Sequence, residues 1–257
     1  MKRMRVLGIA AMLVVSLLRV DASLVLNPAT SITNQLVVQP IIVSQAAAQG
    51  GATAEYFGDA TQSTHIFSLI DEIYSQAGVD VTFLSANTYT SSFTYNGYPA
   101  DYSVSTRPQN HLNTIFNDIN LPVNVNSNVI NMVLVDIVPG FDFTSENTAN
   151  GLAFLGANGI AQFVGSNLLT WEGGREVVAS VVAHEIGHNL GLNHEGAPGG
   201  DTENLMYSPG SSRDGERLDS TQITTILNSQ YTTAIPEPSA LMLVSLAGLL
   251  AFRRRWK

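Results

Sequence analysis

Three of the five histidines in this 257-residue chain lie within eleven consecutive positions, in the pattern H-E-x-x-H-x-x-G-x-x-H. His184 and His188 are four residues apart, so on a helix their imidazoles project from one face, one turn apart. Such a pair can bind one Zn²⁺, and His194 can supply a third ligand. Three protein ligands leave the fourth position of the metal open to water, as in catalytic zinc sites. The spacing therefore predicts a helix that carries a catalytic zinc site.

The remaining fixed positions of the pattern have separate roles. Glu185 follows the first ligand directly, and its carboxylate can reach a water on the metal. Gly191 can adopt a left-handed backbone conformation at little steric cost and so end the helix. The chain then turns, which allows His194 to return to the metal. His65 and His111 lie far from the pattern, and we interpret them as surface or capping residues.

Basic residues are concentrated at the two ends of the chain, and the region between them is acidic. Residues 23–235 contain four arginines, no lysine and nineteen of the 21 acidic residues (all but Asp21 and Glu237), a net charge of −15. Such a charge repels phosphate backbones, which excludes nucleic-acid binding. The chain has no cysteine, so disulfides and thiolate ligands are excluded as well. A body of roughly 210 residues can still bury one sizeable core, which predicts one domain.

The first 22 residues have the three parts of a secretory signal peptide. The positive start contains Lys2, Arg3 and Arg5. An apolar stretch follows at residues 6–18, and Ala22 offers a small residue at the cleavage site. We therefore expect signal peptidase to cleave after Ala22. The alternative is an uncleaved anchor, although this apolar stretch is short for a membrane span.

The end of the chain has the reverse arrangement. Pro236-Glu237-Pro238 comes first, then an apolar segment at residues 240–252, then three consecutive arginines. A helix of that length rises about 20 Å against roughly 30 Å of bilayer hydrocarbon, so it would hold the membrane only transiently. The tail resembles the PEP-CTERM sorting signal of exopolysaccharide-producing Gram-negative bacteria. That resemblance implies that an exosortase removes the tail and releases or attaches the protein at the cell surface; the alternative is a plain C-terminal anchor.

Residues 23–234 are expected to form the folded domain, and residues 235–257 the sorting signal. Within the domain, runs of apolar and β-branched residues predict strands, and apolar positions at helical spacing predict helices. The expected strands are at residues 36–43, 79–84, 129–138, 153–155 and 160–164. The expected helices are at residues 64–77, 108–117, 175–190 and 220–228. This order predicts an α/β (α+β) fold.

Some details of this assignment can be tested directly against a structure. Pro40 suggests that the first strand lies at an edge or contains a bulge. The nearly continuous apolar run at residues 129–138 indicates a buried central strand. Asp219 is the expected N-cap of the last helix. Residues 45–63 and 85–106 are expected to be loops.

The order of elements, taken with the histidine pattern, resembles the catalytic domain of the metzincin zinc metallopeptidases. Residues 204–207 (Asn-Leu-Met-Tyr) look like the Met-turn of that clan. The resemblance implies a twisted mixed sheet behind the active-site helix, and a small C-terminal subdomain with the Met-turn and a terminal helix. Met206 would then form a hydrophobic floor beneath the three imidazoles.

The family within the clan stays open at this point. Residues 183–194 are closest to the reprolysins, the short spacing to Met206 is closer to the matrixins, and Glu195 is similar to the astacins. What the clan implies is a secreted zinc endopeptidase. Its three histidines would hold Zn²⁺ through Nε2, and Glu185 would act as the general base. A peptide substrate would lie along a strand edge, with residues 160–164 as the candidate.

Other interpretations remain beside this one. The chain could be a zinc-binding surface or matrix protein without hydrolytic activity, although a structural zinc needs no general base such as Glu185. It could also be a zinc hydrolase that acts on something other than peptides. Tyr207 is a candidate for stabilising an oxyanion, although a tyrosine beside a Met-turn can simply pack. A Ca²⁺ site is a further alternative, although the spacing matches no established calcium loop. Its candidate ligands are Asp142, Glu146 and Asn150.

Overall fold

The structure is a computed structural model, and it describes residues 26–45, 54, 56–91, 112, 113, 115–135, 151–163, 174–195, 200–207 and 215–236. The expected signal peptide, the apolar tail segment and the candidate calcium ligands all lie outside these residues. Within the described part of the chain, no helix combines the length and the apolar character needed to cross a membrane.

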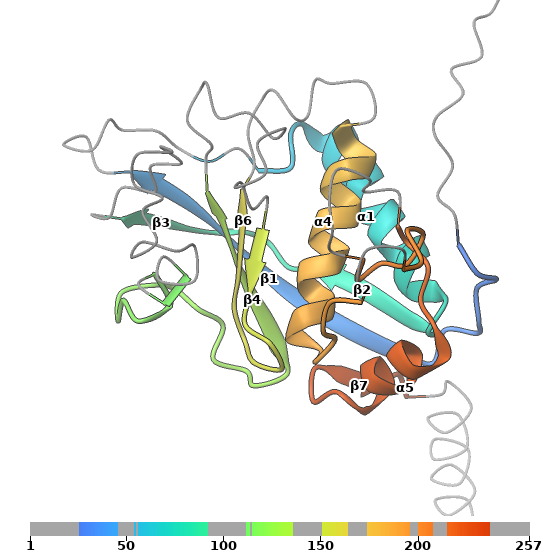
Figure 1. Ribbon diagram of the computed structural model, residues 1–257. Helices are drawn as coiled ribbons and strands as arrows, with labels where there is room; N and C mark the ends of the chain where they lie inside the picture. Colours follow the sequence, from blue (N-terminus) through green and yellow to red (C-terminus); the bar gives the residue numbers. More distant parts are fainter. Residues whose placement is uncertain are drawn as a thin grey trace, which may run out of the picture.

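A seven-stranded mixed sheet forms the centre of the described fold (Figure 1). Its strands are β1 (Asn34–Gln45), β2 (Val79–Phe83), β3 (Asn87–Ser91), β4 (Val129–Val135), β5 (Gly151–Ala153), β6 (Ile160–Phe163) and β7 (Thr232–Ala234). The helices are α1 (Ala60–Ser75), α4 (Gly174–Asn189) and α5 (Ser220–Asn228). The strand order is β2-β1-β4-β6-β5, with β3 and β7 also paired to β1. The pairs of β5 with β6 and of β7 with β1 are antiparallel, and the others are parallel. The mixed α/β fold predicted from the sequence is confirmed.

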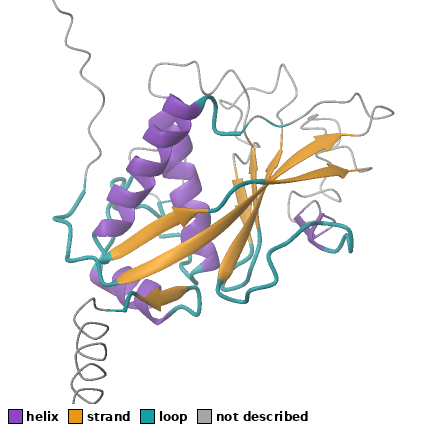
Figure 2. Cartoon of the chain, turned by 180° about the vertical axis from the view of Figure 1, so that it is seen from behind, coloured by secondary structure: helices purple, strands orange, loops and turns teal. Residues whose placement is uncertain are grey.

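Both faces of this sheet are covered, which explains the continuous apolar run of β4. Side chains alternate along the strand, so that Met132 faces α1 and α4 while Val133 faces the other way. Figure 2 shows the two long helices together on one face of the sheet. The other face packs against Leu112, Ile115 and Leu121, which precede β4 in the sequence. All seven residues of β4 are buried, so the prediction of a central buried strand is confirmed.

β1 lies inside the sheet and pairs with other strands along both of its edges. The prediction drawn from Pro40, that this strand lies at an edge or contains a bulge, is therefore wrong. The strand pairs with β2 and then β3 on one side, and with β7 and then β4 on the other. The Val38 carbonyl still accepts from the Leu84 N–H at 2.9 Å, but β3 begins only at Asn87. Pro40, two residues after Val38, points its backbone nitrogen to this same side, into the gap between β2 and β3. Its missing N–H therefore removes no bond from the sheet, and the register with β4 runs through it without a bulge.

The capping residue determines where a helix begins more closely than the spacing of its apolar residues does. α1 begins at Ala60 rather than at residue 64, because Asp59 caps it: its carboxylate accepts the N–H groups of Thr61 and Gln62, and Gln62 reciprocates. Asp219 makes the same capping box at α5, as the sequence predicted. Residues 60–63, expected to be loop, are therefore helical.

Short strands were placed less well by the sequence. β3 lies in a region expected to be loop, and β7 was not expected at all. β5 begins at Gly151, two residues before the strand expected at 153–155. The expected helix at 108–117 is helical at residues 112, 113, 115 and 116, and its first four residues lie outside the described chain.

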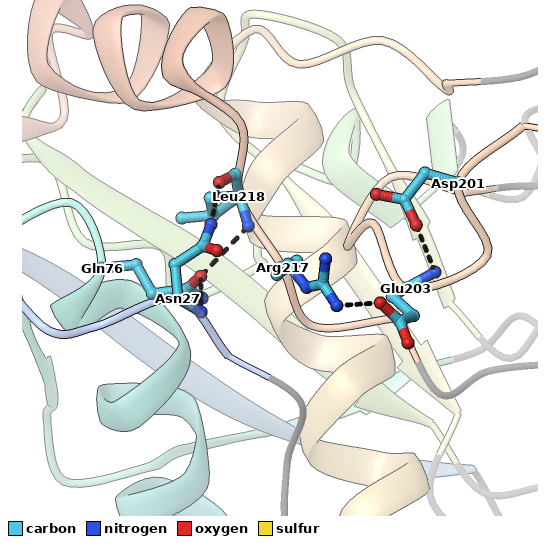
Figure 3. A network of polar contacts seen from close by, with 6 residues as sticks. All are labelled: Asn27, Gln76, Asp201, Glu203, Arg217 and Leu218. Carbon is cyan, nitrogen blue, oxygen red and sulfur yellow. Dashed lines mark hydrogen bonds and ion pairs between the residues drawn. The ribbon is translucent and has the colours of Figure 1, made fainter.

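Gln76 joins the end of α1 to the segment that precedes α5 (Figure 3). Its Oε1 accepts the N–H groups of Asn27 and Leu218 at 3.0 and 3.2 Å. Its Nε2 donates to the carbonyls of Ile73 and Glu216, each at 2.8 Å. The Asn27 side chain donates to the Leu218 carbonyl at 2.8 Å. One buried amide thus holds the N-terminal segment, α1 and the C-terminal subdomain (the described residues after α4) together.

Candidate active site

The three histidines of the sequence pattern converge in the folded chain. His184 and His188 lie on α4, and His194 follows the turn after it. One ring nitrogen from each lies within 4.8 Å of the other two, and the Nε2 atoms of His188 and His194 are 3.0 Å apart. In the described part of the chain, this is the only such cluster of three or more possible metal ligands. Three imidazoles around an open position are the donor set of catalytic zinc, so these residues fit a zinc ion.

Gly191 ends α4 in the way that its position in the pattern predicted. Its φ is +100°, in the region that favours glycine. The Gly191 N–H donates to the His188 carbonyl and the Leu192 N–H to the Gly187 carbonyl, each at 2.9 Å. These two bonds form a Schellman motif, which satisfies the last carbonyls of the helix and redirects the chain. The redirected chain brings His194 back beside His188.

Backbone carbonyls fix the orientation of two of the rings. His184 Nδ1 lies 2.7 Å from the Leu205 carbonyl oxygen, and His188 Nδ1 lies 2.7 Å from that of Leu192. A carbonyl oxygen can only accept, so each Nδ1 must carry the proton. Each Nε2 is then the unprotonated nitrogen, as required of a metal ligand. These two hydrogen bonds give a physical reason for the prediction that Nε2 binds the metal. The two carbonyls are the acceptors for the Nδ1 protons that the sequence did not identify.

The surroundings also favour the neutral form of the imidazoles. Burial lowers the pKa of His188, and the neighbouring His194 lowers it further, against a smaller opposite effect of the Leu192 carbonyl. Burial also lowers the pKa of His194. Both rings therefore stay unprotonated to a lower pH than an exposed histidine would, which keeps their Nε2 lone pairs available.

Glu185 is buried beside the first histidine, with only 7% of the residue exposed. Its side chain lies against the backbone of β5, since a Cβ built on Gly151 would fall 2.5 Å from Glu185 Cγ and 2.9 Å from Oε1. A carboxylate held at this position, one residue from a metal ligand, is suited to proton transfer.

Met206 is completely buried next to the helix that carries the histidines. A Cβ on Gly187 would lie 2.8 Å from the Sδ of Met206, so the thioether packs against α4 at Gly187. This glycine lies between His184 and His188 in the sequence. The Met206 carbonyl accepts the N–H of Glu195 at 2.8 Å, which ties the turn to the segment that follows His194. The preceding residue, Leu205, supplies the carbonyl that orients His184. The turn thus bonds to His184 and to the residue after His194 and packs against α4 at Gly187, and its role as a Met-turn stays a prediction.

The Met-turn is itself held by buried amides. Asn204 Nδ2 donates to Gln222 Oε1 at 3.1 Å, Gln222 Nε2 donates back to Asn204 Oδ1 at 2.9 Å, and this oxygen also accepts the Met206 N–H at 2.8 Å. Figure 3 shows the neighbouring contacts, in which Arg217 pairs with Glu203 and the Glu203 N–H donates to Asp201. Gln222 is also the capping-box residue of α5. The terminal helix therefore fixes the turn beneath the histidines.

Comparison with known proteins decides the family. Residues 60–195, more than half of the chain, match the reprolysin-like metallopeptidases of family M12B. The chain belongs to this family. This metallopeptidase is therefore zinc-dependent, as the histidine pattern predicted, and of the three families left open by the sequence it is the reprolysin-like one that matches.

Several solved structures match the chain at low sequence identity. Archaemetzincin from Methanopyrus kandleri is 16% identical, with a TM-score of 0.44 over 76% of this chain and 95% of its own. Metalloproteinase-II from Bacteroides fragilis is 16% identical, with a TM-score of 0.43 over 80% of this chain and 56% of its own. Archaemetzincin from Archaeoglobus fulgidus is 18% identical, with a TM-score of 0.38 over 75% of this chain and 99% of its own. No curated protein matches the sequence significantly.

At this end of the sheet formed by the described residues, the edge strand is β5 and not β6, so residues 160–164 were the wrong candidate for a substrate-binding edge. β6 is paired on both sides, with β4 through Ile160–Phe163 and with β5 through Gly151–Ala153. β5 ends the strand order, and the side chain of Glu185 lies against it. The signal for this strand was weak, because three residues in a glycine- and asparagine-rich region are too few for a periodic pattern.

Gly151→Ala is expected to lower kcat for peptide hydrolysis by about 10- to 100-fold with zinc content unchanged. The added methyl group would overlap Glu185, and the carboxylate would have to turn away from its position beside His184. The backbone of Gly151 does not need glycine, since its φ is not positive. Kinetics with metal analysis would measure the effect, and Glu185→Ala supplies the control: in that background, Gly151→Ala should change nothing further.

The remaining site predictions have different outcomes. His65 lies on α1 and pairs with Glu176 of α4 at 3.4 Å, so it joins two helices rather than binding metal. His111, Glu237 and Pro238 lie outside the described residues, and Pro236 is exposed at their boundary. Tyr207 is partly buried, and its role at an oxyanion stays a prediction.

Proposed function

We propose that this metallopeptidase is an exported endopeptidase that uses Glu185 as its general base. The observation that carries the proposal is the convergence of His184, His188 and His194 beside a buried carboxylate. A site that only held zinc for structure would need neither an open coordination position nor a carboxylate kept beside it at the cost of desolvation.

Each group in the site has a chemical role in this proposal. Zinc held by the three imidazoles would polarise the scissile carbonyl and would lower the pKa of a bound water to about 7. Glu185 accepts a proton from the attacking water and delivers it to the leaving amine. The Leu205 and Leu192 carbonyls hold the imidazoles of His184 and His188 in the orientation that presents Nε2.

The substrate is a protein or peptide that binds along β5. β6 pairs with one edge of this strand, and no other strand of the described residues pairs with it, so an extended peptide can pair with the second edge. The backbone of Gly151 contacts Glu185, so a peptide in this position would present its carbonyls beside the general base. Backbone pairing alone selects no side chain, which leaves sequence preference to contacts made by the side chains of the substrate.

Export and surface sorting complete the proposal. The signal peptide at residues 1–22 would be removed by signal peptidase, and the tail at residues 235–257 by an exosortase after transient membrane anchoring. β7 ends at Ala234, and Ile235 and Pro236 are exposed immediately after it. Exposure of these two residues supports a processing site just beyond the folded domain. The protein would act at the cell surface or in the extracellular matrix of a Gram-negative bacterium.

A digest of a peptide library with the purified mature protein tests the activity. Cleavage at internal bonds, identified by mass spectrometry, is expected with zinc present, lost after treatment with a chelator and restored by zinc. Release of terminal residues alone would contradict an endopeptidase. Zinc binding at one ion per chain without any cleavage would instead favour a non-hydrolytic surface or matrix protein.

A further inference from the structure

The last residue of the zinc-binding helix, Asn189, holds the turn between β5 and β6 (residues 154–159). We propose that Asn189 is a positioning residue that sets the place of the substrate-binding strand relative to the histidines. This inference rests on the proposed function, in which a peptide pairs with β5.

Asn189 is 1% exposed, and its amide makes three hydrogen bonds, all to the β5–β6 turn. Nδ2 donates to the carbonyls of Phe154 and Gly159 at 2.9 and 3.1 Å. Oδ1 accepts the Gly159 N–H at 3.2 Å. The two hydrogen bonds to Gly159 pair the side-chain amide with the N–H and the carbonyl of one residue, as two backbone strands pair. Only an amide side chain of this length satisfies both groups. A buried group that is fully satisfied in this way holds its partners rigidly.

A backbone contact adds to this attachment. The Gly156 N–H donates to the carbonyl of His188 at 2.8 Å, so the turn also caps the end of α4 at a residue that carries a metal ligand. Within the turn, the Phe154 N–H donates to the Gly159 carbonyl at 3.1 Å, which closes it just beyond the pair of Ala153 with Ile160. The turn and the end of the zinc helix are therefore one hydrogen-bonded unit.

The position of β5 depends on this unit because the strand is short. It has three residues, and β6 is its one partner strand among the described residues. Its first residue, Gly151, contacts Glu185, and its last residue is followed by the turn that Asn189 holds. A peptide bound to β5 would take its position beside the three imidazoles from these two points, so a strand that lost one of them would bind the peptide less well in the ground state and the transition state alike.

Asn158 offers a matched comparison in the same turn. Its Oδ1 accepts from the backbone N–H and the side chain of Asn131 at 2.8 and 3.3 Å, and its Nδ2 donates to the Val129 carbonyl at 2.7 Å. It makes the same number of hydrogen bonds as Asn189, but it joins the turn to β4 instead of α4. Replacing either asparagine by alanine removes three hydrogen bonds, and only the loss at Asn189 removes bonds between the turn and the zinc helix, where the bond of the Gly156 N–H to the His188 carbonyl remains.

The experiment compares Asn189→Ala and Asn158→Ala in the zinc-loaded protein. For a peptide cleaved by the wild type, Asn189→Ala should raise KM about tenfold with kcat within about threefold, since uniform binding is what is lost. Inhibition by acetohydroxamate, which needs the metal but no strand, should keep its wild-type constant. Asn158→Ala should lower the unfolding temperature by a similar amount and leave KM unchanged. Equal KM values for both variants, or parallel loss of peptide and acetohydroxamate binding, would overturn the proposal.

Hydrogen exchange gives a readout that needs neither activity nor a variant. In the wild-type protein, the amides of Gly156 and Gly159 should be protected to the same extent as the last turn of α4 and should open together with it. Fast exchange at Gly159 would contradict the attachment, even if Asn189→Ala failed to fold. A wild-type protein that showed this protection but cleaved no peptide would refute the proposed function and leave the attachment intact.

Discussion

Replacing Glu185 with alanine is expected to abolish nearly all peptide hydrolysis while one zinc remains bound per chain. The carboxylate is not a metal ligand, so the three imidazoles and their carbonyl partners remain in place. What is lost is the group that accepts the proton from water, and general bases contribute about 10²- to 10⁴-fold to rates.

Steady-state kinetics and metal analysis of the same preparation would measure both quantities. Glu176→Ala is the matched control, since Glu176 lies on the same helix and pairs with His65 instead of lying beside a metal ligand. That control should retain wild-type activity. If the Glu185 variant kept more than about a tenth of wild-type kcat/KM, a general base worth 10²-fold or more would have to be another residue.

Local patterns predicted the metal site well because its determinants are close together in sequence. The spacing of His184 and His188 depends only on the helical repeat, and the return of His194 depends only on the turn at Gly191. Asp219 was identifiable as an N-cap for the same reason, since a cap bonds to the residues that directly follow it. The apolar run of β4 predicted that both faces of this strand are buried, and this prediction did not require knowing which elements cover them.

Contacts between distant segments could not be predicted in this way. Pro40 obeys the rule that proline cannot donate to a sheet, yet it sits in the central strand because β2 ends and β3 begins opposite it. Gly151 carried no signal as a glycine, since its role comes from Glu185, thirty-four positions later. Asn189 likewise reads as an ordinary polar residue at a helix end, and only the fold brings the turn between β5 and β6 to its amide.

The acceptors of the histidine Nδ1 protons were unpredictable for a different reason. They are the main-chain carbonyls of Leu192 and Leu205. Every residue has a main-chain carbonyl, so the residue type at these positions does not indicate which one accepts the proton. A motif can therefore identify the ligands of a metal more readily than the groups that orient them.

Replacing His188 with alanine is expected to remove both zinc binding and activity. The Nε2 of His188 lies 3.0 Å from that of His194, and the ring of His188 is oriented by the Leu192 carbonyl. Loss of a group that merely orients a ligand lowers metal affinity about 10- to 100-fold, so the loss of a ligand itself should exceed that range. The variant should also leave the Leu192 carbonyl without its donor, at a cost of about 1–3 kcal/mol in the free energy of unfolding.

Competition with a chelating dye would give the zinc affinity, and thermal unfolding with and without zinc would separate metal loss from misfolding. The wild type should gain stability from zinc, because a ligand that binds only the folded state raises the unfolding temperature, and the variant should gain almost none. His65→Ala is the control, since that histidine lies on α1, away from the cluster, and should leave both affinity and activity unchanged. A His188 variant that still bound one zinc tightly and cleaved peptides would show that the metal is held by a different set of residues.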